Sequence, residues 1–463
     1  MLSYRKLAMR VLGRPLHTGG GGIDSPRPAS QRAAALVLTA ALLTGAAFPA
    51  FADTYYIENG DITISAGESG NDVTQNNVTT KNDTDTIITN SDKATASSHT
   101  VTIDAGNDKV EVTLKDVNID TSSRNKAAVS VTGSGNTTIK LDGDNALKSD
   151  TSRSGIYGSG SLTISGGEND SLTAQGGSGA NGISSSGSLT ISGGTVTANG
   201  DDGGRGISSS GRVTISGGST VTAKGGSGTI SGGDGICSSG GVTISGGSTV
   251  TANGGNGGRL VGGDGIRSSG GVTISGGSTV TANGGNGSSG RDGISSSSGV
   301  TVSDGTVTAT GGNSTGSYGS GGDGIRSDGG VTISGGTVKA AGGDSKNGSG
   351  GDGIRSGDID LSGSLELTAK AGSPNGKALS QRGNELDLNT IKDKLGPGAK
   401  VTTTDADGKV NQVPIPGPVE PEEPVIPEES SSSSDGGSAA PSAPASSLPG
   451  LTVTDKSGAV ISY

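Results

Sequence analysis

The dipeptide Gly-Ile occurs eight times between residues 155 and 354 of this 463-residue chain, and its spacing limits the possible folds more than any other feature. Successive copies are 27, 24, 29, 30, 28, 31 and 29 residues apart. Each unit contains three short segments that favour β-structure, namely Gly-Ile with a polar tail, VTIS or a variant, and TVTA or a variant. Gly-Gly and Ser-Gly pairs separate these segments and favour turns. A period of about 20–50 residues is typical of repeat proteins, in which each unit stacks on its neighbours.

The alternation of apolar and polar residues predicts which side chains face inward. In VTIS the Val and Ile share one face, and in TVTA the Val and Ala share one face with the threonines opposite. Stacking the units places Ile266, Ile274 and Val280, together with their counterparts in the other units, in three inward ladders. Three strands per unit predict an all-β fold, a parallel β-helix whose coils lie about 4.8 Å apart.

The composition excludes a single large hydrophobic core. The chain has 90 glycines, no tryptophan, two phenylalanines and 28% hydrophobic residues, compared with about 45–50% in a typical soluble domain. This composition is compatible either with disorder or with a line of small stacked cores. The regular period favours the stacked cores.

Residues 1–52 have the order of a secretory signal peptide. A segment with six Lys and Arg residues precedes an uncharged apolar run that begins at 33, and Ala50-Phe51-Ala52 follows as a cleavage site. The run is shorter than the about 20 residues that span a membrane. We therefore expect a secreted protein, extracellular or at the cell surface, without stable membrane insertion after cleavage.

Without this leader the chain has 27 basic and 43 acidic residues, a net charge of −16. A surface with this charge repels nucleic acid and anionic membranes and attracts divalent cations. A nucleic-acid partner is therefore not expected.

Beyond the leader, the repeat and the composition divide the chain into further segments. Residues 53–98 have weak repeats and predict an N-terminal cap region, and residues 99–400 predict the parallel β-helix, with a short helix near 384–396 that closes the stack. Residues 413–450 are rich in Pro, Glu and Ser, which predicts a disordered spacer. Residues 451–463 are a strand-like remnant that is too short to fold alone.

An aspartate precedes Gly-Ile in five successive units: Asp234, Asp264, Asp292, Asp323 and Asp352. Coil stacking would place neighbouring carboxylates about 5 Å apart, where like charges repel. A Ca²⁺ ion bound between coils would relieve this repulsion, because Ca²⁺ accepts several oxygen ligands in irregular geometry. The alternative is a structural aspartate that bonds the backbone of its own turn, and Asn181 and Arg205 at the equivalent earlier positions favour it.

A basic column lies beside the aspartates, because Arg267, Arg326 and Arg355 each follow the inward Ile and therefore face outward. Arginine binds carboxylates through two parallel hydrogen bonds, so these side chains are candidates to bind an acidic sugar polymer. The alternative is an internal pairing with the aspartates. Tyr318, in the longest loop after a TVTA segment, adds an aromatic face that a sugar ring could contact.

The sequence offers little for hydrolytic chemistry. Residues 53–463 contain one histidine, His99, and one cysteine, Cys237. A Ser-His-Asp triad would have to use His99, and a zinc site made of His and Cys lacks ligands.

The phrases GSLTISGGTVTANG, DGIRSSGGVTISGGSTVTANGG and DGIRSDGGVTISGGTVKAAGG resemble a family of exported bacterial carbohydrate-binding domain-containing proteins, over roughly residues 100–370. The resemblance implies a right-handed β-helix similar to that of polysaccharide lyases, bound calcium, and non-catalytic binding to plant-type polysaccharides, including acidic ones. We therefore expect a secreted polysaccharide-binding module. A structural or adhesive surface protein without specific glycan binding, or a polysaccharide lyase whose base is an arginine, are the alternatives.

Overall fold

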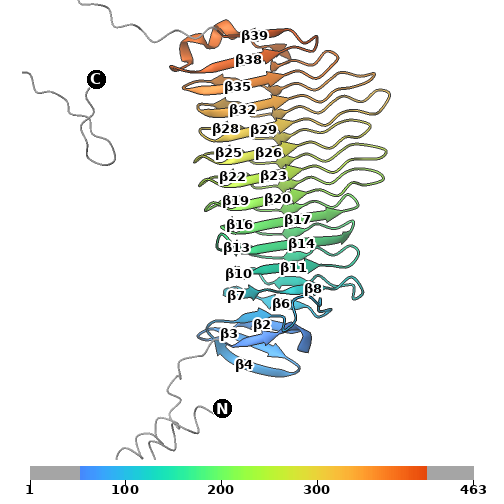
Figure 1. Cartoon of the computed structure of the whole chain (residues 1–463), viewed down its shortest axis with the longest axis vertical. Helices are drawn as coiled ribbons and strands as arrows, with labels where there is room; N and C mark the ends of the chain where they lie inside the picture. Colours follow the sequence, from blue (N-terminus) through green and yellow to red (C-terminus); the bar gives the residue numbers. More distant parts are fainter. Residues whose placement is uncertain (1–52, 414–463) are drawn as a thin grey trace, which may run out of the picture. The chain divides into compact units, whose positions relative to one another are not determined.

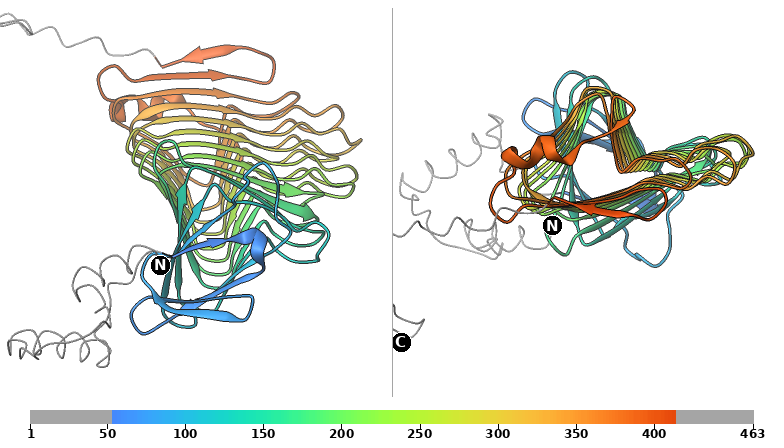
Figure 2. Two further views of the ribbon diagram at one scale, coloured as in Figure 1. Left: turned by 60° about the horizontal axis from the view of Figure 1, so that its bottom comes forward. Right: turned by 90° about the horizontal axis from the view of Figure 1, so that it is seen from above.

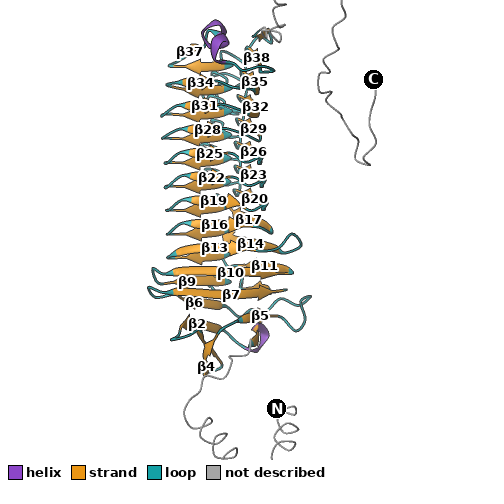
Figure 3. Cartoon of the chain, turned by 90° about the vertical axis from the view of Figure 1, so that its left-hand side faces the viewer, coloured by secondary structure: helices purple, strands orange, loops and turns teal. Residues whose placement is uncertain are grey.

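The computed structural model describes residues 53–413, and it confirms the predicted all-β solenoid with three strands per coil and about 11 coils. The chain passes in each coil from one strand to the next around three sheets, so that strands within the stack pair in parallel with their counterparts in the coils before and after (Figures 1 and 3). The predicted signal peptide, the spacer beyond Val413 and the remnant at 451–463 lie outside the described residues.

The sheet that contains the Gly-Ile segments, here called the GI sheet, has 15 strands. In spatial order they are β4 (Val78–Asp83), β3 (Asn71–Gln75), β2 (Ile62–Ala66), β6 (Val101–Asp104), β9 (Val129–Thr132), β12 (Ile156–Gly158), β15 (Ile183–Ser185), β18 (Ile207–Ser209), β21 (Ile236–Ser238), β24 (Ile266–Ser268), β27 (Ile294–Ser296), β30 (Ile325–Ser327), β33 (Ile354–Ser356), β36 (Leu379–Gln381) and β37 (Asn384–Glu385).

The VTIS segments form a second sheet of 12 strands, the VTI sheet. Its strands are β1 (Thr54–Tyr56), β5 (Ile87–Thr89), β7 (Lys109–Lys115), β10 (Asn136–Asp142), β13 (Ser161–Ser165), β16 (Leu189–Ser192), β19 (Val213–Ser216), β22 (Val242–Ile244), β25 (Val272–Ile274), β28 (Val300–Val302), β31 (Val331–Ile333) and β34 (Ile359–Leu361).

The TVTA segments form a third sheet, also of 12 strands, the TVTA sheet. Its strands are β8 (Asn118–Asp120), β11 (Asp144–Lys148), β14 (Ser171–Ser178), β17 (Thr195–Asp201), β20 (Thr220–Lys224), β23 (Thr249–Asn253), β26 (Thr279–Asn283), β29 (Thr306–Thr310), β32 (Gly336–Ala341), β35 (Leu365–Lys370), β38 (Lys400–Thr404) and β39 (Val410–Gln412).

The inward ladders are confirmed. Ile266 pairs in parallel register with the equivalent Ile of the coils on both sides, and it has no exposed surface. Ile274 and Val280 are equally buried within their own sheets. Burying one such side chain contributes about 1.5–3 kcal/mol, and the repeat supplies one at each inward position of each coil. Small residues are therefore sufficient for a continuous core.

Antiparallel strands occur at the two ends of the described stack. At the N-terminal end β2, β3 and β4 pair in antiparallel fashion, and at the C-terminal end β36 pairs with β37 and β38 with β39. These pairings occupy backbone groups that an exposed sheet edge would leave open. A short 3-10 helix, η1 (Ile57–Asn59), follows β1, and the helix predicted near 384–396 is the 3-10 helix η2 (Leu388–Lys394).

The loops that follow the TVTA strands project together from one side of the solenoid (Figure 2). We call these loops the glycine fin: residues 225–235, 254–265, 284–293, 311–324 and 342–353. Each loop runs out and back, and its two arms hydrogen-bond through backbone groups. The Gly255 N–H donates to the Gly233 carbonyl of the preceding coil, and the Gly263 N–H donates to the Gly255 carbonyl, both at 2.8 Å. A Cβ added at Gly263 would lie 1.9 Å from the Gly233 oxygen, so only glycine fits this packing.

Candidate ligand groove

In the GI strands from β6 to β36 the residue after the first inward residue lies on the outer face of the sheet, and the parallel register stacks these residues in one column. We call it the outer column, and in order it contains Thr102, Ser130, Tyr157, Ser184, Ser208, Cys237, Arg267, Ser295, Arg326, Arg355 and Ser380. The column runs along the solenoid axis. Residues that are about 28 positions apart in sequence therefore become neighbours about 4.8 Å apart.

Four cavities lie on this outer column. The largest, about 670 Å³, is at the N-terminal end and includes Tyr157. A cavity of about 380 Å³ includes Arg267, and cavities of about 410 and 370 Å³ share Arg326 and Arg355. In the cavities of about 380 and 410 Å³ the opposite wall is the returning arm of the glycine fin, for example Ser289–Asp292. The cavities therefore define a polar groove beside the GI sheet.

All five predicted aspartates are buried, with exposed fractions of 9% or less, and all except Asp264 line one of these cavities. Each accepts a backbone N–H from the next coil. The Asp264 Oδ1 atom accepts the Asp292 N–H at 3.0 Å, and the Asp292 Oδ1 atom accepts the Asp323 N–H at 2.8 Å. Asn181 does the same for the N–H of Arg205. These bonds fit the structural alternative, but the predicted bond to the aspartate's own turn is wrong, because each bond joins one coil to the next.

Burial and crowding make three of these carboxyls weaker acids than an exposed aspartate. Desolvation, followed by the neighbouring charge of Asp292, raises the pKa of Asp264 to about 7. The same two causes raise the pKa of Asp323 to about 7. Desolvation also raises the pKa of Asp292. Asp264, Asp292 and Asp323 therefore hold a proton more readily than an exposed aspartate does.

Two arginines that the sequence did not single out as ligand-binding candidates pair with the aspartates. The Arg205 Nε atom lies 3.1 Å from Asp234 Oδ2, and the Arg291 Nε atom lies 3.7 Å from Asp264 Oδ1. Arg291 occupies a position that is glycine in the adjacent coils, and it lines two of the cavities. Its Nε atom is buried and has no hydrogen-bond partner among residues 53–413. The sequence could have indicated Arg291, because RDGI at this coil replaces the GDGI of the neighbouring coils.

The predicted ligand-binding arginines Arg267, Arg326 and Arg355 are exposed and lie in the outer column. Arg326 and Arg355 are direct register partners. None of the three forms an ion pair with a residue in the described part of the chain, in contrast to Arg205. Tyr318 is 95% exposed, and the four cavities above do not include it. Its role in binding stays a prediction.

The aspartates do not form a polydentate metal site in the structure. Among residues 53–413 there is no group of three or more His, Cys, Asp or Glu side chains arranged to hold a metal ion. Each of the five aspartates uses one carboxylate oxygen to accept a backbone N–H, which leaves at most the other oxygen for a cation. Calcium binding stays a prediction.

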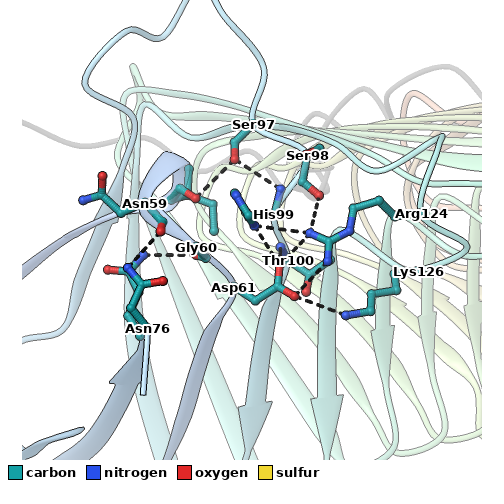
Figure 4. A network of polar contacts seen from close by, with 12 residues as sticks. Asn59, Gly60, Asp61, Asn76, Ser97, Ser98, His99, Thr100, Arg124 and Lys126 are labelled. Carbon is teal, nitrogen blue, oxygen red and sulfur yellow. Dashed lines mark hydrogen bonds and ion pairs between the residues drawn. The ribbon is translucent and has the colours of Figure 1, made fainter. Parts of the chain in front are cut away.

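His99 belongs to a polar network at the N-terminal end of the groove (Figure 4). Its Nδ1 atom lies 3.2 Å from Asp61 Oδ1. The Arg124 guanidinium lies 2.8 and 3.1 Å from the two Asp61 oxygens, and Lys126 Nζ lies 3.2 Å away. Although desolvation opposes it, the combined hydrogen bonds, beginning with the Thr100 N–H, hold the pKa of Asp61 well below its ordinary value. An ionised, saturated carboxylate of this kind positions its neighbours and is a poor proton acceptor.

The fold and the groove together define a β-helical protein with a polar binding face parallel to its axis. A sequence model of the carbohydrate-binding domain-containing protein family matches residues 94–353, which is more than half of the chain, and the chain belongs to this family. This membership points to polysaccharide binding on the β-helix and to a binding role without catalysis. Searches of curated proteins and of solved structures returned no significant match. No helix within residues 53–413 has the length and apolar character needed to cross a membrane.

Proposed function

We propose that the protein is a secreted, non-catalytic module that binds an acidic polysaccharide along the outer column. The observation that carries the proposal is the convergence of basic side chains on one cavity of about 410 Å³. Arg291, Arg326, Arg355 and Lys377 all line it, although the whole chain has a net charge of −11.

The charge balance inside the groove supports an anionic ligand. The three aspartates in the same cavity are buried, and burial raises the pKa of both Asp292 and Asp323. The basic side chains therefore face a wall that is less negative than its sequence indicates. Two exposed guanidinium groups in adjacent coils, Arg326 and Arg355, are spaced to contact successive carboxylates of one polymer.

Retention on an immobilised acidic polymer tests the proposal. We expect wild-type protein to be retained on polygalacturonate in low salt, and the double variant Arg326→Ala/Arg355→Ala to be retained at least about tenfold more weakly, because charged hydrogen bonds contribute about 1.5–3 kcal/mol each. Added salt should weaken the wild-type interaction.

Arg212→Ala is a matched control. Arg212 is exposed in the turn before β19, and its Nη1 atom contacts Thr243 of the VTI sheet, so it lies on another face. Equal retention of the double variant and the Arg212→Ala variant would contradict the proposal. Stronger retention on cellulose than on polygalacturonate would mean that the ligand is a neutral polysaccharide and not an acidic one. Retention on no glycan would favour the structural or adhesive alternative.

Calcium assistance is a separate part of the proposal. If an ion bridges the groove to an anionic ligand, a chelator should lower retention on polygalacturonate and also lower the melting temperature. Unchanged values for both would remove calcium from the proposal. Absence of unsaturated product from pectate distinguishes a binding module from a lyase, because a lyase would generate an absorbing double bond.

A further inference from the structure

The N-terminal cavity has a different chemistry from the basic cavity, although both lie on the outer column. Its lining combines one aromatic ring, Tyr157, with hydroxyl side chains of successive coils: Thr102, Ser130 and Ser184. Lys126 and Arg153 stand at its rim. At about 670 Å³ it is the largest of the four cavities.

We infer that this cavity is a saccharide subsite in which the Tyr157 ring stacks against one sugar ring, while the column hydroxyls and Lys126 hydrogen-bond its hydroxyl groups. The inference rests on the proposed function, because it takes the ligand to be a polysaccharide. It adds a second contact point that differs in chemistry from the arginine pair.

The position of Tyr157 suits a stacking platform. Its register partners on the two sides are Ser130 and Ser184, which are too small to cover a phenol ring, and 43% of Tyr157 is exposed. Aromatic side chains present an apolar face with a polar edge and lose little conformational entropy on binding. An exposed aromatic ring among hydroxyl groups offers the apolar and polar contacts that a sugar ring needs.

The rim of the cavity is held in place before a ligand arrives. Lys126 Nζ lies 3.2 Å from Asp61, which also binds Arg124 and the backbone N–H of Thr100, a lining residue (Figure 4). The Arg153 Nε atom donates at 3.2 Å to Oδ1 of Asn125, the residue that precedes Lys126. Such contacts fix side chains that would otherwise lose entropy on binding. The Asp61 network therefore positions Lys126 and Thr100 in the lining of the cavity.

The two ends of the outer column can engage one polymer. Tyr157 is in β12 and Arg326 in β30, six coils further along the GI sheet, which corresponds to about 29 Å. A chain longer than this can contact both ends at once, and linked contacts raise affinity through effective concentration. A shorter oligosaccharide can contact only one end.

Binding of oligogalacturonates shorter and longer than about 29 Å to the full chain tests the inference. We expect Tyr157→Ala to weaken binding of the long oligomers about five- to tenfold, the effect of losing one aromatic contact. Tyr56→Ala is the matched control, because Tyr56 is 41% exposed in β1 of the VTI sheet, on a different face. This control should bind like wild type.

A fluorescence measurement gives an independent readout. The chain has no tryptophan, so Tyr157→Trp introduces a single reporter in the cavity and Tyr56→Trp introduces one outside it. Oligomer addition should change the emission of the first variant and leave the second unchanged. If wild type binds the oligomers but both Tyr157 variants behave like their Tyr56 controls, the subsite is wrong and the proposed function stands. If wild type binds no oligomer, the proposed function itself fails.

Discussion

The N-terminal coils and the regular coils have the same interior but opposite exteriors. In β7, β10 and β11 the outward residues include charged side chains that pair between coils, as in Lys115–Asp142 at 2.6 Å and Lys148–Asp120 at 3.0 Å. In β17, β20, β23, β26 and β29 the outward positions are two columns of threonine. Both regions bury an apolar residue at every second position.

The difference shows that the interior and the backbone, rather than surface charge, hold the coils together. The regular coils lack the charged columns but gain the glycine fin and the buried aspartates, which join each coil to the next through backbone N–H groups. Exposed ion pairs contribute little to stability. The two regions should therefore respond differently to the same kinds of substitution.

The largest expected effect is a small side chain in the fin. Gly263→Ala would place a Cβ 1.9 Å from the Gly233 oxygen, and we expect a loss of about 3 kcal/mol in unfolding free energy because the backbone arms must separate. Thermal melting followed by circular dichroism measures it. Gly299→Ala is the control, since its Cβ would meet nothing closer than 3.6 Å. Similar melting of both variants would show that the fin does not stabilise the solenoid.

The aspartate ladder should tolerate loss of charge but not loss of the acceptor. Asp264→Ala leaves the buried Asp292 N–H without its partner, and we expect a cost of about 1–3 kcal/mol. Asp264→Asn keeps the acceptor, as Asn181 does naturally, and should be at least as stable as wild type at pH 8. A destabilised Asn variant would indicate that the charge itself matters, as a bound cation would require.

The two regions should have opposite pH dependence. The folded-state pKa values of Asp264 and Asp323, about 7, exceed the ordinary value of 3.8. The stability that these groups contribute is therefore complete below pH 3.8 and is lost as the pH rises to about 7. The pKa of Asp61 is lowered, so its contribution is present above pH 3.8 and is lost as the pH falls below it.

Melting temperatures at pH 3, 5 and 8 test this contrast. Wild type should lose stability between pH 5 and 8, and Asp264→Asn/Asp323→Asn should lose less over the same interval. Relative to Asp61→Asn, wild type should lose stability between pH 5 and 3. The charged groups that face Asp264 are Asp234, Asp292 and Arg291. None of these three residues is substituted in the variants. A wild-type melting temperature that rises from pH 5 to 8 would contradict the prediction for the ladder.

The smallest expected effect is the loss of an exposed ion pair in the N-terminal coils. Lys115 and Asp142 are each about half exposed, so solvent and salt screen their attraction. Lys115→Ala should melt within experimental error of wild type, at low and at high salt. A clear destabilisation that disappears in salt would show that surface charge does hold these coils together.

Much of the fold could be predicted from the sequence, because the coil period and the inward residues are local patterns. The eight Gly-Ile copies predicted the stacked GI strands, and the alternation in VTIS and TVTA identified Ile274 and Val280 as core residues. The aspartate and arginine columns followed from the same period. The partners of the aspartates did not, since a turn within one coil and a bond to the next coil look alike in sequence.

The sequence by itself determined the repeat, the faces of the strands and the order of the outer column, because each depends on residue spacing along one strand or one coil. Only the tertiary structure decided that the fin packs back on itself, that Arg291 lies beside Asp264, and that Tyr157 lines the largest of the four cavities described above. Those outcomes depend on how the backbone arms approach one another in space. A hydrogen bond or a cavity forms from distances between coils, and such distances are fixed only when all the coils are stacked.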